Sequence, residues 1–260
     1  MRIHVASVGV LAPGLTGLAE ARRAMAGEAA ILPAAFTVPA AQCLPAAERR
    51  RASTASRLAI ATAEQAIGAA ALPASAMAMV FAAAESAPDI THQLCEVLAG
   101  TREVSPTVFH NSVHNAPLGY LSIAVGAKGS GTSVCRGEWT FAAALVLAAL
   151  EAASTERPVL LVCYDSPFPP ALAAAWPVVC PTAISLVLTP ARDERTLATC
   201  SLSIGPEAPA DDWPAWIPAD WRANASARGF MALAAWAGPG RARVRIPYAP
   251  GSSLEIRCDG

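Results

Sequence analysis

The chain has 260 residues, of which 54% are hydrophobic and only 15% are charged, and its formal net charge is −1 at pH 7. Globular proteins usually have about a quarter charged residues, so this chain can bury a large core and hide apolar surface against another subunit. The near-zero charge gives no electrostatic basis for binding nucleic acid. The longest apolar runs, such as 141–150, are too short to span a membrane, and the N-terminus lacks the apolar core of a signal peptide.

The seven cysteines are irregularly spaced and include no CxxC pair. This pattern argues against a zinc site and against a disulfide framework, and it favours a reducing, cytoplasmic location. The glycine-rich run 126–131 is not followed by the GK[ST] sequence of a phosphate-binding loop. We therefore expect no metal and no cofactor.

The chain begins with a predicted strand over 3–10, which is β-branched and apolar and is broken by Pro13-Gly14. A helix is predicted over 15–26, followed by a proline-containing loop over 28–47. Apolar residues at helical spacing then predict a helix over 52–70.

Three arginines, 49–51, precede that helix. We interpret them as a solvated helix start, with a contact patch for an acidic partner as the alternative. The short apolar run 76–83 predicts a strand buried on both faces, and a helix is expected over 90–98.

A distinctive segment, 105–150, follows. It contains a polar stretch with His110 and His114, predicted as a loop, and then the glycine-rich run. A strand over 130–134 leads into a lone cysteine, Cys135, and a strongly apolar helix is expected directly after it.

Three further strands are predicted, over 158–164, 183–188 and 196–204. Buried strands interleaved with helices indicate an α/β fold. The remainder reads as a proline- and tryptophan-rich linker, a helix and two short strands, predicted over 205–220, 224–237, 244–248 and 254–258. We therefore divide the chain into 1–204 and a C-terminal segment, 205–260.

The glycine run leading through a short strand to Cys135 resembles the nucleophile region of β-ketoacyl synthases. Within this superfamily, the run from Ser105 to Ala124 is similar to the short, chain-length-factor-like proteins of aryl polyene gene clusters. The resemblance implies a thiolase-like half-fold, corresponding to the N-terminal half of a ketosynthase, with a small C-terminal α+β cap. A complete synthase supplies its catalytic histidines from a second half, whereas the histidines here, 4, 92, 110 and 114, all precede Cys135.

This departure implies a non-catalytic partner subunit of a β-ketoacyl-ACP synthase in aryl polyene, polyketide or fatty-acid-like biosynthesis. Such a subunit would form a heterodimer or larger complex with a full-length ketosynthase, stabilise it, shape its product cavity and meet acyl carrier protein indirectly. One alternative is an acyltransferase or condensing enzyme in which Cys135 accepts the acyl group and His110 or His114 acts as base. A second alternative is a non-catalytic scaffold protein.

Several side chains are candidates for lining the product cavity or for contacting the partner: Phe109, Asn111, Asn115, Ser133, Glu138 and Trp139. On a helix, Trp139 would share a face with Cys135. The histidine and asparagine pairs at 110–115 have three interpretations. They are a catalytic or metal-binding group with Glu103 as the one nearby third ligand, hydrogen-bonding residues that pin a loop, or partner contacts, which we favour.

Overall fold

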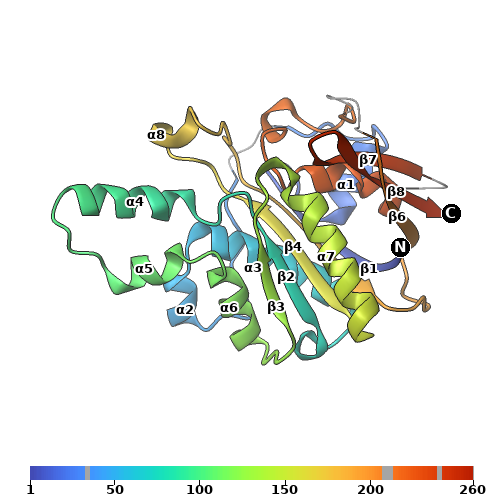
Figure 1. The fold of residues 1–260 in the computed structure, drawn as a ribbon, viewed down its shortest axis with the longest axis horizontal. Coiled ribbons are helices and arrows are strands. Elements are labelled where there is room, and N and C mark those ends of the chain that lie inside the picture. The colour runs from blue at the N-terminus through green and yellow to red at the C-terminus, as the bar shows by residue number, and fades with distance from the viewer. Residues whose placement is uncertain (33–35, 207–212, 239–241, 260) are drawn as a thin grey trace.

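The computed structural model describes the chain except for residues 33–35, 207–212, 239–241 and 260. A single sheet of eight strands runs through the molecule in the order β3-β2-β4-β5-β1-β6-β8-β7 (Figure 1). The strands are β1 Arg2–Leu11, β2 Ala78–Ala82, β3 Gly131–Val134, β4 Val159–Asp165, β5 Thr182–Thr189, β6 Ala198–Pro206, β7 Ala242–Ala249 and β8 Ser252–Asp259. Strand β3 pairs with β2 and ends the sheet on one side.

Strands β3, β2 and β4 are parallel to one another, whereas the remaining neighbours are antiparallel. The helices are α1 Leu18–Met25, α2 Ala46–Arg51, α3 Thr54–Ala70, α4 Pro88–Ala99, α5 Pro106–Ser112, α6 Ala116–Ala124, α7 Thr140–Thr155, α8 Pro170–Ala173, α9 Arg228–Met231 and α10 Leu233–Ala237. Helices α4 and α5 project away from the sheet, while α3 and α7 pack along it (Figure 1).

The core has two layers because side chains alternate along each strand. On β2, Val80 belongs to the cluster that includes residues of α7, α9 and α10, and Phe81 belongs to the cluster on the α3 side. Strand β4 divides in the same way between Leu161 and Leu160. The result is a sheet covered by helices on both faces, as expected for an α/β domain.

Helix α3 shows how local sequence sets an element. The Ser53 hydroxyl accepts a hydrogen bond from Ser56 N at 3.0 Å and caps the helix. The helix ends where Ala71 adopts a left-handed conformation, with φ of 52°. The α/β half-fold and the succession of its strands along the chain agree with the sequence prediction.

Three predicted details were wrong. The polar stretch with His110 and His114 is not a loop throughout, because Pro106–Ser112 form α5, and His114 lies in the turn between α5 and α6. The helix expected directly after Cys135 begins later, after a 3₁₀ turn at Gly137–Trp139. The helix expected over 224–237 is divided into two short helices, α9 and α10.

The three arginines at 49–51 lie in a separate short helix, α2, before the Ser53 cap. The C-terminal strands continue the main sheet, since β8 pairs with β6 and β7 pairs with β8. The predicted boundary at 204/205 falls within β6, and part of the predicted linker lies outside the described residues.

A disulfide joins Cys200 to Cys258, which are register partners on β6 and β8. The expectation of no disulfide is therefore wrong for this pair, which lies 58 residues apart in the sequence and was hidden by the irregular cysteine spacing. The other five cysteines are free. In the described ranges, no helix has both the length and the apolar character needed to cross a bilayer.

Candidate functional site at the carboxyl ends of the parallel strands

The carboxyl ends of β2, β3 and β4 meet at one edge of the sheet, because these three strands are parallel. Ligand sites of open α/β sheets usually lie at this edge. The segment Ala83–Ser86 leaves β2 there, Cys135 follows β3 directly, and Asp165 ends β4. The edge therefore gathers the predicted nucleophile and several polar groups from distant parts of the chain.

Cys135 is exposed and has a free thiol. Its Sγ donates a hydrogen bond to Ala84 O at 3.0 Å. It lies outside the following helix, since Arg136 and a 3₁₀ turn separate it from α7. The prediction that Cys135 and Trp139 share a helix face is therefore wrong.

His114 lies at the same edge. Its Nε2 is 3.4 Å from Ala83 O, so His114 and Cys135 contact carbonyls of consecutive residues. His110 lies elsewhere, on α5, where its ring meets the edge of Tyr120 with centroids 5.6 Å apart. Of the two predicted histidines, His114 is thus the one that contacts the same short segment as Cys135.

Asp165 is a buried carboxylate that sequence reasoning treated only as the end of a strand. It accepts hydrogen bonds from Ala84 N at 3.2 Å and from Ser226 N at 2.7 Å. Burial raises its pKa to about 6, and these hydrogen bonds oppose that rise. Asp165 therefore ties the segment that supports Cys135 to the C-terminal segment.

A second set of hydrogen bonds surrounds Asp165. The Ser86 and Tyr164 hydroxyls lie 3.0 Å apart, and the Thr182 and Ser226 hydroxyls lie 2.7 Å apart. Burial raises the pKa of Tyr164, so its hydroxyl remains protonated at neutral pH. These groups hold the edge in place without introducing a further charge.

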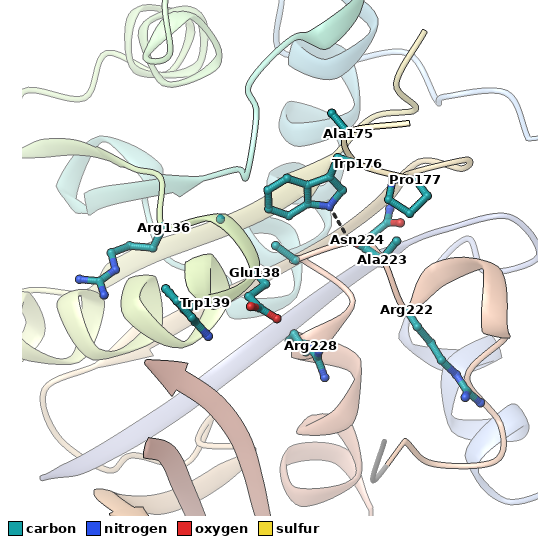
Figure 2. A pocket seen from close by; sticks show the side chains of 12 residues that line it. Arg136, Glu138, Trp139, Ala175, Trp176, Pro177, Arg222, Ala223, Asn224 and Arg228 are labelled. Carbon is teal, nitrogen blue, oxygen red and sulfur yellow. Dashed lines mark hydrogen bonds between the residues drawn. The ribbon is translucent and has the colours of Figure 1, made fainter. Parts of the chain in front are cut away.

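A cavity of about 490 Å³ lies beside this edge (Figure 2). The segment 136–139, which follows Cys135, forms one wall, so the predicted residues Glu138 and Trp139 both line the cavity. The other walls come from 175–177 after β4 and from the C-terminal segment. Figure 2 shows the Trp176 ring facing Glu138 and Trp139 from the opposite side.

Two features fix the shape of this cavity. The Trp176 indole Nε1 donates to Ala223 O at 2.9 Å, which anchors the ring. Gly137 has a φ of +57°, and a Cβ at that position would lie 3.3 Å from Trp176. A glycine is therefore favoured where the chain turns past the indole. Sequence reasoning missed Trp176, which carries no distinguishing local pattern.

The predicted interface residues differ in exposure. The Phe109 side chain on α5 is 62% exposed, and Asn115 is exposed before α6. Asn111 is instead buried, where its amide donates to Arg51 O and Thr107 O at 2.9 Å each and accepts from Ser53 N at 3.3 Å. Asn111 thus fastens α5 to the start of α3, as the hydrogen-bonding interpretation describes.

Ser133 is half-buried on β3, at the side of the sheet. Gly131, two residues earlier on β3, allows close packing, because a Cβ there would lie 2.9 Å from Leu118 Cδ2 on α6.

The residues that the structure describes include no cluster of three histidine, cysteine or acidic side chains able to hold a metal ion.

Comparison with solved structures shows the same fold. One match spans 99% of this chain and 99% of the other at 22% identity, with a TM-score of 0.72. It belongs to the structure described as the ketosynthase ApeO in complex with its chain length factor ApeC from Xenorhabdus doucetiae. The ishigamide ketosynthase/chain length factor matches with a TM-score of 0.71 at 12% identity, over 99% of each chain.

A third match has a TM-score of 0.74 at 12% identity and covers 100% of this chain and 99% of the other. Its structure is described as AntDE:AntF, a type II PKS acyl-carrier protein in complex with its ketosynthase bound to the hexaketide. No curated protein sequence matches the chain. The family model described as beta-ketoacyl synthase, N-terminal domain, matches residues 23–214, which is most of the chain. The chain therefore belongs to the β-ketoacyl synthase N-terminal domain family.

Proposed function

We propose that this chain is the chain-length-factor-like, non-catalytic subunit of a β-ketoacyl-ACP synthase in aryl polyene, polyketide or fatty-acid-like biosynthesis. One observation carries the proposal: the chain is matched from end to end by a chain of a ketosynthase–chain length factor complex. The match spans 99% of both chains, so the short length is shared with that chain. The chain's role would be to stabilise a full-length ketosynthase and to bound the cavity in which the product grows.

The free side of β3 supports a partner there. Met79 N donates to Ser130 O and Ala83 N donates to Val134 O, so these carbonyls face β2. Backbone groups alternate sides along a strand, so the groups of Gly131 and Ser133 face outward. An unpaired strand edge readily pairs with another chain, and we assign this edge to the ketosynthase.

Exposed apolar side chains lie near the same side of the molecule. Ile123 on α6, which packs near β3, is 84% exposed, and Phe109 and Val113 are 62% and 42% exposed. Exposed apolar groups next to an open strand edge are typical of a surface that another subunit covers. We propose that the ketosynthase covers them, with acyl carrier protein meeting the complex indirectly.

The geometry around Cys135 supports a non-catalytic role. The nearby histidine, His114, is directed at a backbone carbonyl, and the Cys135 thiol is engaged by Ala84 O. A condensing site also needs groups that stabilise the developing oxyanion. The family resemblance places those groups in a second half of the synthase.

Co-expression tests this proposal. The chain and its cognate ketosynthase should elute together as a defined complex in size-exclusion chromatography, and the ketosynthase alone should be less soluble or less active. A chain that elutes as a stable monomer, apart from an unaffected ketosynthase, would contradict it.

A second candidate is acyl transfer through Cys135, favoured by the exposed thiol and by His114 at the same edge. Mass spectrometry after incubation with acyl-CoA or acyl carrier protein tests it, with Cys135→Ala as control. A thioester adduct that is lost in Cys135→Ala supports the enzyme. Absence of an adduct, together with unchanged product from the Cys135→Ala complex, removes it.

We also propose that the chain acts in the cytoplasm, where acyl carrier protein and a ketosynthase would be available. Five of its cysteines are free, as expected in a reducing compartment. Cys200 and Cys258 are 1% and 4% exposed, so burial restricts the access of reductants to this pair.

A further inference from the structure

A second cavity of about 490 Å³ lies far from Cys135. It is lined by Arg2 and His4 at the start of β1, by Arg192 and Thr196 of the β5–β6 turn, and by Thr199 on β6. Strand β1 is antiparallel to β5, and β5 is antiparallel to β4, so β1 runs in the same direction as the parallel strands. Its first residues therefore lie at the sheet edge opposite the carboxyl ends.

The cavity is lined by positive and hydrogen-bond-donating groups. Two guanidinium groups, Arg2 and Arg192, come from different segments. His4 on β1 is the register partner of Thr199 on β6, and its Nδ1 is 3.0 Å from Thr199 Oγ1. Among the described residues, the rest of the lining is largely apolar and includes Leu197, Ala198, Ala235 and Trp236. No carboxylate is among these lining residues.

Trp236 lines the same cavity. Its side chain is 1% exposed, and its Nε1–H has no hydrogen-bond partner among the residues that the structure describes. A buried indole N–H normally has a partner, because leaving it unpaired costs about 1–3 kcal/mol. The cavity wall therefore includes the Trp236 side chain, whose Nε1–H is itself buried.

Asp193, in the same turn as Arg192, has an ion-pair partner of its own. Asp193 lies beside Thr196, whose Oγ1 accepts from Asp193 N at 2.9 Å, but its carboxylate is engaged by Arg195 at 2.7 and 3.1 Å. Burial, followed by the charges of Arg2 and Arg192, lowers the pKa of His4.

We propose that this cavity binds a small oxyanion, a phosphate ester or a polycarboxylate, through Arg2, Arg192 and His4. Planar guanidinium groups bind phosphate and carboxylate oxygens in pairs of hydrogen bonds. The site is separate from the open side of β3 and from the carboxyl ends of the parallel strands, where Cys135 lies. Its occupant would therefore act as an effector or as a stabilising ligand.

Isothermal titration calorimetry on the full chain tests this site, with pyrophosphate, inorganic phosphate and citrate as separate probes at matched ionic strength. We expect saturable binding of at least one probe at one site per chain. Stronger binding of pyrophosphate than citrate would indicate a phosphate ester as the natural ligand, and the reverse order would indicate a polycarboxylate.

Arg192→Gln is the informative variant, because Arg192 is exposed in a turn and its loss leaves the core intact. Affinity should fall at least tenfold. The matched control is Arg50→Gln, which removes the same charge from α2 and should leave affinity unchanged. Equal loss in both variants would show nonspecific charge attraction and overturn the site, as would the absence of saturable binding by the unmodified chain at millimolar probe.

Discussion

Asp165 gives the chain a predictable dependence of stability on pH. Burial raises its pKa in the folded state from 3.8 to about 6, so the folded chain binds this proton more tightly than the unfolded chain does. The stabilisation that protonated Asp165 contributes is fully present below about pH 4 and is lost as the pH rises through about 6. The shift corresponds to roughly 3 kcal/mol.

Urea unfolding of wild type and Asp165→Asn at pH 4 and pH 7 measures this effect. The wild type should lose about 3 kcal/mol relative to the variant on going from the lower to the higher pH. Asp89→Asn on exposed α4 is the control and should show no such difference. A wild type and Asp165→Asn that change in parallel would contradict the raised pKa.

Asn111 should contribute more to stability than the next asparagine in the chain, Asn115. Its buried amide satisfies three backbone groups, whereas Asn115 is exposed. Asn111→Ala leaves these groups unpaired and should lower the free energy of unfolding by about 1–3 kcal/mol. Asn115→Ala should change it by less than about 0.5 kcal/mol. Equal effects in chemical denaturation would show that the Asn111 amide adds no net stability.

Trp139 tests whether this chain bounds the product cavity. Its ring lines the cavity beside Glu138, so Trp139→Ala enlarges the space available. In the reconstituted ketosynthase complex, we expect this variant to shift products toward longer chains, as read by mass spectrometry. Trp139→Phe keeps most of the volume and should preserve the distribution. An unchanged distribution in Trp139→Ala complexes of normal activity would remove Trp139 from the cavity wall.

The site residues that lie close together in the chain were predictable from the sequence. The site residues that come from distant segments were not. Cys135, Glu138 and Trp139 are close in the chain, so one glycine-to-helix pattern identifies all three. Asp165 and Trp176 follow a strand that reads only as buried and apolar. Their partners, Ala84, Ser226 and Ala223, lie in distant parts of the chain, and no local periodicity connects residues that only the fold brings together.

At the scale of elements, the buried strands were predictable because β2, β4 and β5 are short apolar runs bounded by turns. Helix α5 was missed because its polar residues mask any periodicity over one or two turns. A local signal was present, since Pro106 stands at the first position of α5 and Pro117 near the start of α6. The C-terminal hairpin was predicted as strands, but its place in the main sheet depends on long-range pairing with β6.

The outward backbone of β3 can be tested with one proline. The N–H of Ser133 faces away from β2, so Ser133→Pro removes a donor from the free edge and leaves the β2 pairing intact. We expect the variant chain to fold and to lose its complex with the ketosynthase. Ser133→Ala keeps the N–H, and the Ser133 hydroxyl has no hydrogen-bond partner among the described residues, so this control should still bind.

Circular dichroism and size-exclusion chromatography distinguish the outcomes. A folded Ser133→Pro chain that still elutes with the ketosynthase would show that the edge of β3 is not the contact. Loss of binding by the alanine control as well would assign the contact to the side chain instead of the backbone.

At the scale of the whole molecule, the disulfide holds the C-terminal segment to the sheet. Cys200 and Cys258 lie on paired strands, and the bond closes a loop of 58 residues. Closing a loop of that length restricts the unfolded chain and contributes about 4 kcal/mol to stability. The ladder between β6 and β8 remains when the bond is reduced, so we expect reduced protein to keep its fold and to unfold more easily.

Chemical denaturation with and without dithiothreitol measures this contribution. Reductant should lower the free energy of unfolding of the wild type and leave that of Cys258→Ser unchanged. Cys95→Ser, which removes one exposed free thiol and keeps the disulfide, should respond like the wild type. A wild type that does not respond, with reduction verified by thiol counting, would mean that the segment 205–260 is held by the strand ladder and its core contacts alone. In that case the C-terminal hairpin would be stable in a reducing compartment without any help from the covalent bond.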